Sequence, residues 1–319
     1  MIEVKNLTKR YGNHLAVDHL NFTVESGKIY GFLGPNGAGK STTMNIMTGY
    51  LGATEGQVLI DGHDILKEPE EAKKNIGYLP EIPPLYMEMT VREYLEFAAE
   101  LKGIKKDKRE PQIEEVIRLA KLRDVENRLI QNLSKGYKQR VGLAQAVLGF
   151  PEIIILYEPT VGLDPKQIIE IRELIRKLAK KHTVILSSHI LAEVREVCDY
   201  IMIISGGKLV ASDTTENLEN MMSGKGQIEV EAKASRDEMD HIIRRTGKIK
   251  EVKYRTSASG ITTAQIIAKG GEDIREELFL AFSHADVPML TLNQSKTTLE
   301  EIFLELTQGS GNRMIKEEK

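Results

Sequence analysis

The sequence predicts an α/β fold for about residues 1–220 and a small α+β domain for residues 221–319. In the first part, short runs that are apolar throughout alternate with helical patterns, which is typical of parallel strands buried between helices. After residue 227 the pattern changes to strand, helix, strand, strand, helix, strand. A length of 319 residues fits roughly two domains.

The predicted parallel strands are apolar runs bounded by Gly, Pro or Ser residues. They are Ile29–Gly34, Asn75–Pro80, Ile153–Tyr157, Thr183–Ser188 and Tyr200–Ser205. Signals for helix starts lie between these runs. Thr90 and Glu93 form a capping box, and Asp164 followed by Pro165 supplies a cap and a first-turn proline. We therefore expect a largely parallel sheet covered by helices.

The tail reads as a small α+β domain of the split βαβ type. Its predicted strands and helices, in order, are Ile228–Ala232, Asp237–Gly247, Ile249–Arg255, Thr262–Lys269, Glu272–Phe282 and Met289–Gln294, with a further amphipathic helix at Thr297–Thr307. No His, Cys or carboxylate residues cluster at ligand spacing in this part. A structural or regulatory role is favoured, and ligand sensing is the alternative.

Charge and composition limit the possible partners. The formal net charge of -3 indicates no basic field for nucleic acid. The single cysteine, Cys198, fits a reducing cytoplasm and is interpreted as a small apolar residue on the inner face of a helix. The apolar runs are far shorter than the roughly 20 residues that span a bilayer. We expect a soluble chain, and we interpret the mixed charges of Ile104–Glu110 as a solvated linker.

The chemistry begins at Gly34–Ser41, GPNGAGKS, which fits the phosphate-binding pattern G-x-x-x-x-G-K-[ST] between a predicted strand and a helix. Glycines let backbone N–H groups turn toward phosphate oxygens, and the helix start adds the positive end of its dipole. Lys40 would reach the β- and γ-phosphates, and Ser41 would ligate magnesium. The predicted nucleotide contacts here are Gly34, Pro35, Asn36, Gly37, Ala38, Gly39, Lys40, Ser41 and Thr42.

Five further motifs accompany this loop in a fixed order. They are YLPE at Tyr78–Glu81, LSKGY at Leu133–Tyr137, IIILYEPT at Ile153–Thr160, VGLD at Val161–Asp164, and His189. This order resembles the nucleotide-binding subunit of an ATP-binding cassette transporter over residues 1–220. It is most similar to the export branch with separate permeases, which includes multidrug, sodium and gliding-related exporters. The segment LEEIFLELT is familiar in that branch, so the resemblance extends through the tail.

The resemblance implies a P-loop NTPase cassette with antiparallel β and helical subdomains beside the parallel sheet, with ATP and Mg²⁺ as cofactors. Tyr11 resembles the aromatic residue that stacks on adenine, with a turn residue as the alternative. Ser134 and Gly136 resemble the signature motif that contacts the γ-phosphate bound by a second subunit. Taken alone, these two residues could be an ordinary helix cap. Their predicted role implies a homodimer of head-to-tail cassettes.

The same resemblance assigns the catalytic residues, which are Glu158, His189 and Lys40. Glu158 resembles the general base that activates water, and a strand-end glutamate paired with a lysine is the alternative. His189 resembles the histidine that contacts the γ-phosphate. Asp164 resembles the acid that communicates across the dimer, and it could cap a helix as well. Glu81 stands where many cassettes carry glutamine near the metal, so we predict that it lines the metal site with Ser41.

Tyr157 departs from the pattern, because an acid that holds magnesium is expected directly before Glu158. A phenol with a pKa of about 10 cannot supply that charge at neutral pH. Ser41 still offers an oxygen ligand, and Glu81 or Glu158 could be drawn toward the ion. The larger ring could also press on Ser41. We expect nucleotide binding to survive and hydrolysis to be slowed, unless the surrounding site has reshaped itself.

Together these patterns predict a cytoplasmic ATPase subunit, peripheral on the inner face of the cell membrane, that powers an exporter through an integral membrane permease. A switch that binds ATP but barely hydrolyses it is the alternative that Tyr157 favours. A cassette acting on DNA or ribosomes is disfavoured, because such proteins tend to carry paired cassettes or long coiled-coil insertions. The segment Glu81–Leu95 could receive a helix of the permease, which charge reversal at Arg92 and Glu93 would test, or could pack on its own domain.

Overall fold

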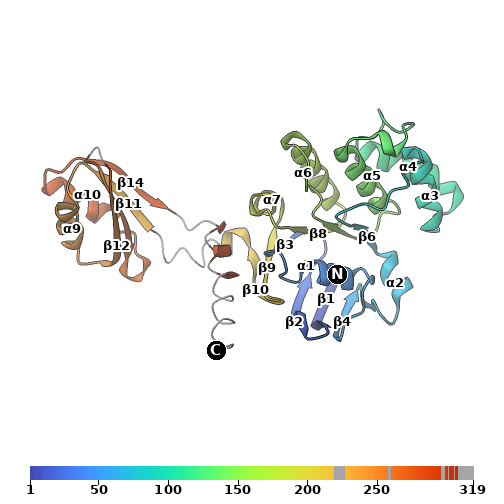
Figure 1. Cartoon of the computed structure of the whole chain (residues 1–319), viewed down its shortest axis with the longest axis horizontal. Helices are drawn as coiled ribbons and strands as arrows, with labels where there is room; N and C mark the ends of the chain where they lie inside the picture. Colours follow the sequence, from blue (N-terminus) through green and yellow to red (C-terminus); the bar gives the residue numbers. More distant parts are fainter. Residues whose placement is uncertain (219–226, 258–259, 296–298, 301, 305, 308–319) are drawn as a thin grey trace. The chain divides into compact units, whose positions relative to one another are not determined.

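The structure, a computed structural model, describes residues 1–218, 227–257, 260–295, 299–300, 302–304 and 306–307 (Figure 1). The chain divides into two compact units, Met1–Thr214 with Leu306–Lys319, and Thr215–Glu305. The predicted domain boundary at residue 220 lies outside the described residues and stays a prediction. The helix predicted at Thr297–Thr307 lies partly outside them, and its described residues are helical.

A six-stranded sheet forms the centre of the first unit, in the order β10-β9-β3-β8-β7-β6. Its strands are β3 (Ile29–Leu33), β6 (Ile76–Leu79), β7 (Ile153–Tyr157), β8 (Thr183–Ser188), β9 (Tyr200–Ser205) and β10 (Lys208–Thr214). Every neighbouring pair is parallel except β9 and β10. The five strands predicted from apolar runs are therefore confirmed. Because parallel strands share one carboxyl edge, the segments after β3, β7 and β8 meet there.

A separate antiparallel sheet has the order β2-β1-β4-β5. Its strands are β1 (Ile2–Tyr11), β2 (His14–Val24), β4 (Glu55–Ile60) and β5 (His63–Asp64). Helix α1 (Lys40–Met47) lies between the two sheets (Figure 1). Its Met44, Ile46 and Met47 are buried in one apolar cluster with residues of both sheets. This packing fixes the start of α1, where the glycine loop ends.

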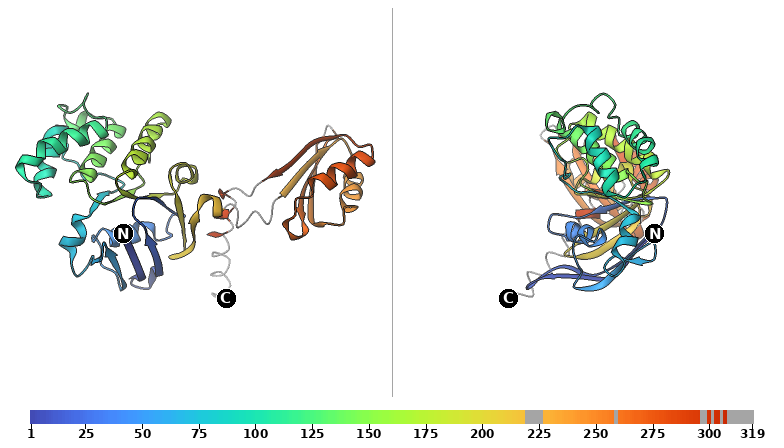
Figure 2. Two further views of the ribbon diagram at one scale, coloured as in Figure 1. Left: turned by 180° about the vertical axis from the view of Figure 1, so that it is seen from behind. Right: turned by 90° about the vertical axis from the view of Figure 1, so that its right-hand side faces the viewer.

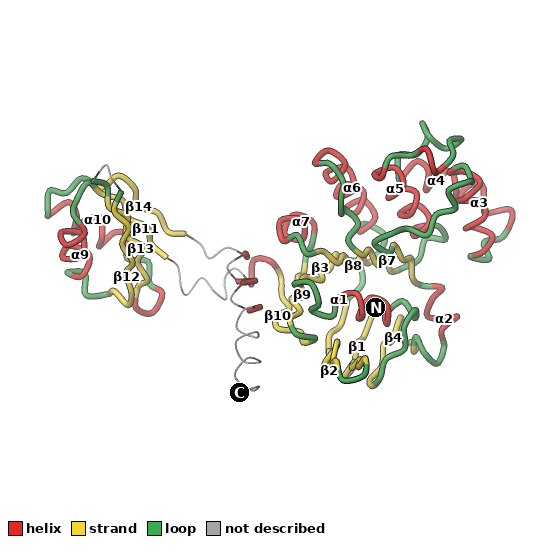
Figure 3. The backbone as a smooth tube through the Cα atoms, in the orientation of Figure 1, coloured by secondary structure: helices red, strands yellow, loops and turns green. Residues whose placement is uncertain are grey.

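Helices α3 to α7 lie on the opposite side of the large sheet from α1, as Figure 2 shows from behind and Figure 3 shows by secondary structure. They are α3 (Val91–Leu101), α4 (Lys106–Leu119), α5 (Lys135–Val147), α6 (Pro165–Ala179) and α7 (Leu191–Val197), while α2 (Pro69–Lys74) precedes β6. The capping box of Thr90 and Glu93 is confirmed at the start of α3. The prediction of a linker at Ile104–Glu110 is wrong, because α4 begins at Lys106 and most of this charged run is therefore helical.

The second unit has the predicted split βαβ order. It comprises β11 (Gln227–Ala232), α9 (Arg236–Arg244), β12 (Ile249–Thr256), β13 (Thr262–Ala268), α10 (Arg275–His284) and β14 (Met289–Ser295). The strands pair antiparallel in the order β12-β13-β11-β14, and both helices pack on one apolar core. Within the described residues no group of three or more His, Cys, Asp or Glu side chains is placed to hold a metal ion.

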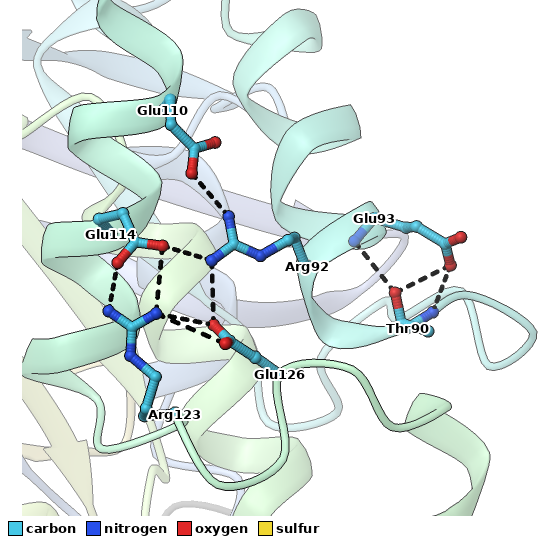
Figure 4. Close-up of polar contacts among 7 residues, drawn as sticks. All are labelled: Thr90, Arg92, Glu93, Glu110, Glu114, Arg123 and Glu126. Carbon is cyan, nitrogen blue, oxygen red and sulfur yellow. Dashed lines mark hydrogen bonds and ion pairs between the residues drawn. The ribbon is translucent and has the colours of Figure 1, made fainter.

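Arg92 connects α3 to α4 and to the loop that follows (Figure 4). Its guanidinium donates to Glu110 at 2.8 Å, to Glu126 at 3.0 Å, and to Glu114. Arg123 donates to Glu114 and Glu126 as well. Charge reversal at Arg92 would therefore break contacts within this unit, so it cannot test binding of a permease. The hydrogen bonds from Arg123 and Arg92 lower the pKa of Glu114 to about 2.

This lowered pKa makes the contribution of Glu114 to stability dependent on pH. Folding favours the ionised form, so the contribution is fully present above the unfolded pKa of 4.5 and is lost as the pH falls toward 2. We expect Glu114→Gln to unfold at lower urea than the parent at pH 7, and the difference to shrink below pH 4.5. Glu96→Gln, at an exposed α3 position, is the control, and a pH-independent difference for Glu114→Gln would contradict this assignment.

Candidate nucleotide-binding site

The loop Gly34–Ser41 follows β3. At Gly34 and Gly39 its backbone leaves no room for a side chain. Gly39 has a φ of 102°, in the left-handed region that favours glycine. A Cβ at Gly39 would lie 2.5 Å from the carbonyl oxygen of Ala16, and a Cβ at Gly34 would lie 2.5 Å from that of Ile204. The loop is therefore held tightly between β2 and β9. Its N–H groups precede the first turn of α1, a favourable place for an anion.

Lys40 is buried and folds back over this loop. Its Nζ donates to the carbonyl oxygens of Gly34 at 2.7 Å and Pro35 at 3.1 Å. Burial lowers the pKa of the Lys40 ammonium, and the charge of Glu158 opposes that shift. The side chain thus holds a positive charge at the loop, as a triphosphate site requires.

Glu158 and His189 lie together at the carboxyl ends of β7 and β8. The Glu158 Oε2 atom is 2.9 Å from His189 Nδ1. Glu158 is 5% exposed and has a φ of 48°, and its N–H donates to the carbonyl of Ser187. The carboxylate is therefore fixed with an imidazole, rather than a lysine, as its partner among the described ion pairs.

Glu193 is a site residue that the sequence motifs did not indicate. This buried carboxylate on α7 accepts hydrogen bonds from Thr160 Oγ1 at 2.5 Å and Ser188 Oγ at 3.2 Å. Thr160 lies two residues after Glu158, and Ser188 lies directly before His189. Glu193 therefore connects the two loops that present the carboxylate and the imidazole. In the sequence, the only signal for Glu193 is that a hydroxyl residue, Thr160 or Ser188, lies beside each of the two motifs.

Tyr157, the last residue of β7, contacts the expected metal ligand directly. Its Oη atom is hydrogen-bonded to Ser41 Oγ at 2.6 Å. Its ring packs against the apolar cluster between the two sheets. Burial raises the pKa of the phenol, with an opposing contribution from the Ser41 hydrogen bond. Tyr157 is therefore a neutral hydroxyl at neutral pH, in the place where a carboxylate was expected.

The side chains around Ser41 do not fit the predicted magnesium site. Magnesium requires several oxygen ligands in near-octahedral geometry. Here Ser41 Oγ is hydrogen-bonded to the phenol of Tyr157, the Glu158 carboxylate is hydrogen-bonded to His189, and Glu81 is exposed.

The predicted signature residues Ser134 and Gly136 lie at the start of α5, and Asp164 lies at the start of the neighbouring helix α6. Ser134 caps α5 by accepting from the N–H of Tyr137, and Asp164 caps α6 by accepting from the N–H of Gln167 at 2.9 Å. A Cβ at Gly136 would lie 2.5 Å from the Gln167 side chain, so the two helix starts are in close contact. Within the described residues no hydrogen bond joins either start to the glycine loop.

The other predicted contacts lie along the same loop and at its neighbours. Asn36 is exposed, Ala38 is buried with its N–H donating to the carbonyl of Pro35, and Thr42 is half-buried in the first turn of α1. Tyr11 ends β1 and is 48% exposed, and the Lys9 Nζ lies 5.4 Å from the centroid of its ring. An exposed ring of this kind is free to stack on another planar group.

The comparisons with known proteins identify the family. A model described as ABC transporter matches residues 17–161. The bacitracin transport ATP-binding protein BcrA of Bacillus licheniformis is 42% identical over 69% of this chain and 71% of BcrA. The chain belongs to the ABC transporter family. As a cassette of that family it is an ATP-binding ATPase, and the predicted P-loop NTPase fold is confirmed.

Two further comparisons bear on the extent of this ABC cassette. The linearmycin resistance ATP-binding protein LnrL of Bacillus subtilis is 30% identical over 96% of this chain and 98% of LnrL, so the similarity includes the second unit. A dimeric structure of the ATP-binding cassette MJ0796 in a post-hydrolysis state with ADP and Pi has a TM-score of 0.61 and 28% identity, and covers 67% of this chain and 98% of that one. Among the described helices of the cassette, none is long and apolar enough to cross a membrane.

Proposed function

We propose that this ABC cassette is the ATP-binding subunit of an exporter, working at the inner face of the cell membrane as a head-to-tail homodimer with a separate permease. The observation that carries this proposal is that the predicted nucleotide contacts lie in two separate places. The glycine loop, Lys40, Glu158 and His189 gather at the carboxyl edge of the large sheet, whereas Ser134 lies at a separate helix start. A second copy can supply that helix start to the loop. The names of BcrA and LnrL, for bacitracin transport and linearmycin resistance, support the transport role.

In this proposal each side chain acts in a role that its position allows. Lys40 and the loop N–H groups bind the phosphates. Glu158 orients and deprotonates the attacking water, while His189 holds the carboxylate and contacts the γ-phosphate. Tyr11 stacks on adenine, and Tyr11→Ala should weaken binding of ATP while leaving binding of tripolyphosphate unchanged. Asp164 positions the start of α6 near the partner copy.

Dimerisation is the test of the proposed function. Light scattering is expected to show a monomer that becomes a dimer when ATP is added. Ser134→Asp should keep the helix cap, since aspartate is also a good cap, but should place a negative charge against the phosphates of the partner's nucleotide. We expect it to weaken ATP-driven dimerisation by at least about tenfold.

Ser134→Asn is the matched control, because asparagine caps equally well without charge. It should dimerise like the parent chain. ATP binding to the single chain should be the same in all three proteins. Dimerisation of Ser134→Asp at the parental ATP concentration would contradict the head-to-tail arrangement.

A second candidate function is a nucleotide switch with slow hydrolysis, and one observation favours it. The 2.6 Å contact between Tyr157 and Ser41 replaces the carboxylate that a cassette of this family is expected to use for its metal. Under this candidate ATP binding closes the dimer normally, while turnover is slow. The Tyr157→Asp experiment below separates it from a fully active ATPase.

We further propose that a groove beside Glu81–Leu95 receives the permease. The groove has a volume of about 730 Å³, and its lining includes Tyr50, Ile82 and Pro84. Tyr50 and Ile82 are 84% and 83% exposed. Exposed apolar side chains around a concave surface are typical of a protein interface. Part of the segment also packs on its own domain, since Arg92 donates to Glu126, outside the segment, at 3.0 Å.

Ile82→Ser is expected to reduce co-purification of this chain with its permease, without changing its affinity for ATP. The reason is the loss of an exposed apolar anchor from the groove. Leu101→Ser is the matched control, because Leu101 is 72% exposed and does not line the groove. Equal recovery of the permease by both variants would contradict the docking proposal.

A further inference from the structure

Ser41 and Tyr157 form a hydroxyl pair at the start of α1. Ser41 directly follows Lys40, and Tyr157 directly precedes Glu158, so the pair adjoins both the phosphate-binding lysine and the proposed base in the sequence. Their oxygens are 2.6 Å apart, a short and well-formed O–H···O hydrogen bond. The Tyr157 ring packs against the apolar core, which restricts its movement away from Ser41.

The hydrogen-bonding capacity of this pair differs from that of a metal site. A hydroxyl group has one proton that it can donate to an acceptor, whereas a metal ion binds to the lone pairs of the hydroxyl oxygen. When Tyr157 donates to Ser41 Oγ, one lone pair of Ser41 is used and its own proton is free. Ser41 can then donate that proton to a phosphate oxygen. The pair therefore offers a hydrogen-bond donor to a phosphate oxygen that would otherwise contact a magnesium ion.

The nearby charges fit a phosphate site that works with donors alone. Lys40 supplies a buried positive charge, and the loop N–H groups and the start of α1 add further donors. The carboxylate of Glu158 is already paired with His189 at 2.9 Å. In the part of the chain that the structure describes, no group of three or more His, Cys, Asp or Glu side chains is placed to hold a metal ion.

We propose that this cassette binds the triphosphate of its nucleotide without a divalent cation, with the Tyr157–Ser41 hydroxyl pair donating to a phosphate oxygen in the metal's place. The inference rests on the proposed function, because it assumes that the loop binds ATP. It differs from the slow-hydrolysis candidate, since it concerns the affinity of binding and makes no statement about turnover.

The test is calorimetric titration of the full chain with ATP, in magnesium buffer and in EDTA. For the parent chain we expect the two dissociation constants to agree within about twofold. Tyr157→Asp removes the hydroxyl pair and introduces a metal-binding carboxylate, so we expect magnesium to tighten its ATP binding at least about tenfold. Tyr157→Phe removes only the hydroxyl, and we expect its affinity in EDTA to fall about 2- to 10-fold below the parent value.

Three results would overturn the inference. The first is ATP binding by the parent chain that magnesium tightens about tenfold or more. The second is a Tyr157→Asp variant with no greater dependence on magnesium than the parent. The third is a Tyr157→Phe variant that binds ATP in EDTA as tightly as the parent. Absence of ATP binding by the parent in both buffers would instead remove the proposed function, and this inference with it.

Discussion

Replacing Lys40 with alanine is expected to weaken ATP binding by about 10- to 100-fold, which corresponds to the loss of charge-assisted hydrogen bonds to the phosphates. The lysine is buried over the loop, with Nζ 2.7 Å from the carbonyl oxygen of Gly34. No other lysine or arginine makes a hydrogen bond to this loop in the described part of the chain. Calorimetric titration with ATP measures the effect directly.

Lys102 provides a control for the loss of a lysine whose ammonium group donates to backbone carbonyls. Its Nζ also donates to backbone carbonyls, those of Gln145, Ala146 and Leu148, and burial lowers its pKa to about 8. Lys102→Ala should lower the melting temperature and leave ATP affinity within about twofold of the parent value. If Lys40→Ala bound ATP as tightly as Lys102→Ala, the glycine loop would not be the phosphate site.

Replacing Tyr157 with aspartate is expected to raise ATP turnover in magnesium buffer by at least about tenfold, which is about 1.4 kcal/mol of activation free energy. The change releases Ser41 from its hydrogen bond and restores a carboxylate at the end of β7. Glu158 and His189 are already within 2.9 Å of each other, so the proposed base needs no rearrangement. Phosphate release measured at saturating ATP checks the prediction.

Tyr157→Phe separates the two effects of that substitution, since it releases Ser41 without adding a charge. We expect its turnover to stay within a few-fold of that of the parent chain. A melting curve for each variant excludes loss of folding as the cause of a difference. Equal turnover in the parent chain and Tyr157→Asp would show that the tyrosine does not impair hydrolysis.

The sequence predicted the parallel sheet and the tail domain well because their signals are local. Ile153–Tyr157 is apolar throughout, and burial on both faces produces that pattern. β1 and β2 were not predicted individually, because their pairing has register shifts, such as the one between Val4 and Leu7, that disrupt regular alternation. The Ile104–Glu110 run was misread because its charges lie on the exposed side of a helix, a pattern that a linker also gives.

The candidate site was predictable where a motif carries it. Lys40 was identified by the glycine-loop pattern, and Glu158 and His189 by the resemblance to a transporter cassette; the structure places the last two in contact. The bond from Tyr157 to Ser41 joins residues 116 positions apart, so no local pattern contains it. Glu193 lies in an ordinary helix and acts through Thr160 and Ser188, which gives it no motif of its own.

That shared carboxylate has a mechanical consequence. Because Thr160 and Ser188 are tied to the same side chain, the two loops after β7 and β8 cannot shift independently without breaking a buried hydrogen bond. A displacement of the loop that carries His189 would therefore also displace the loop that leads from β7 to α6. We expect the two loops to move together when the terminal phosphate leaves.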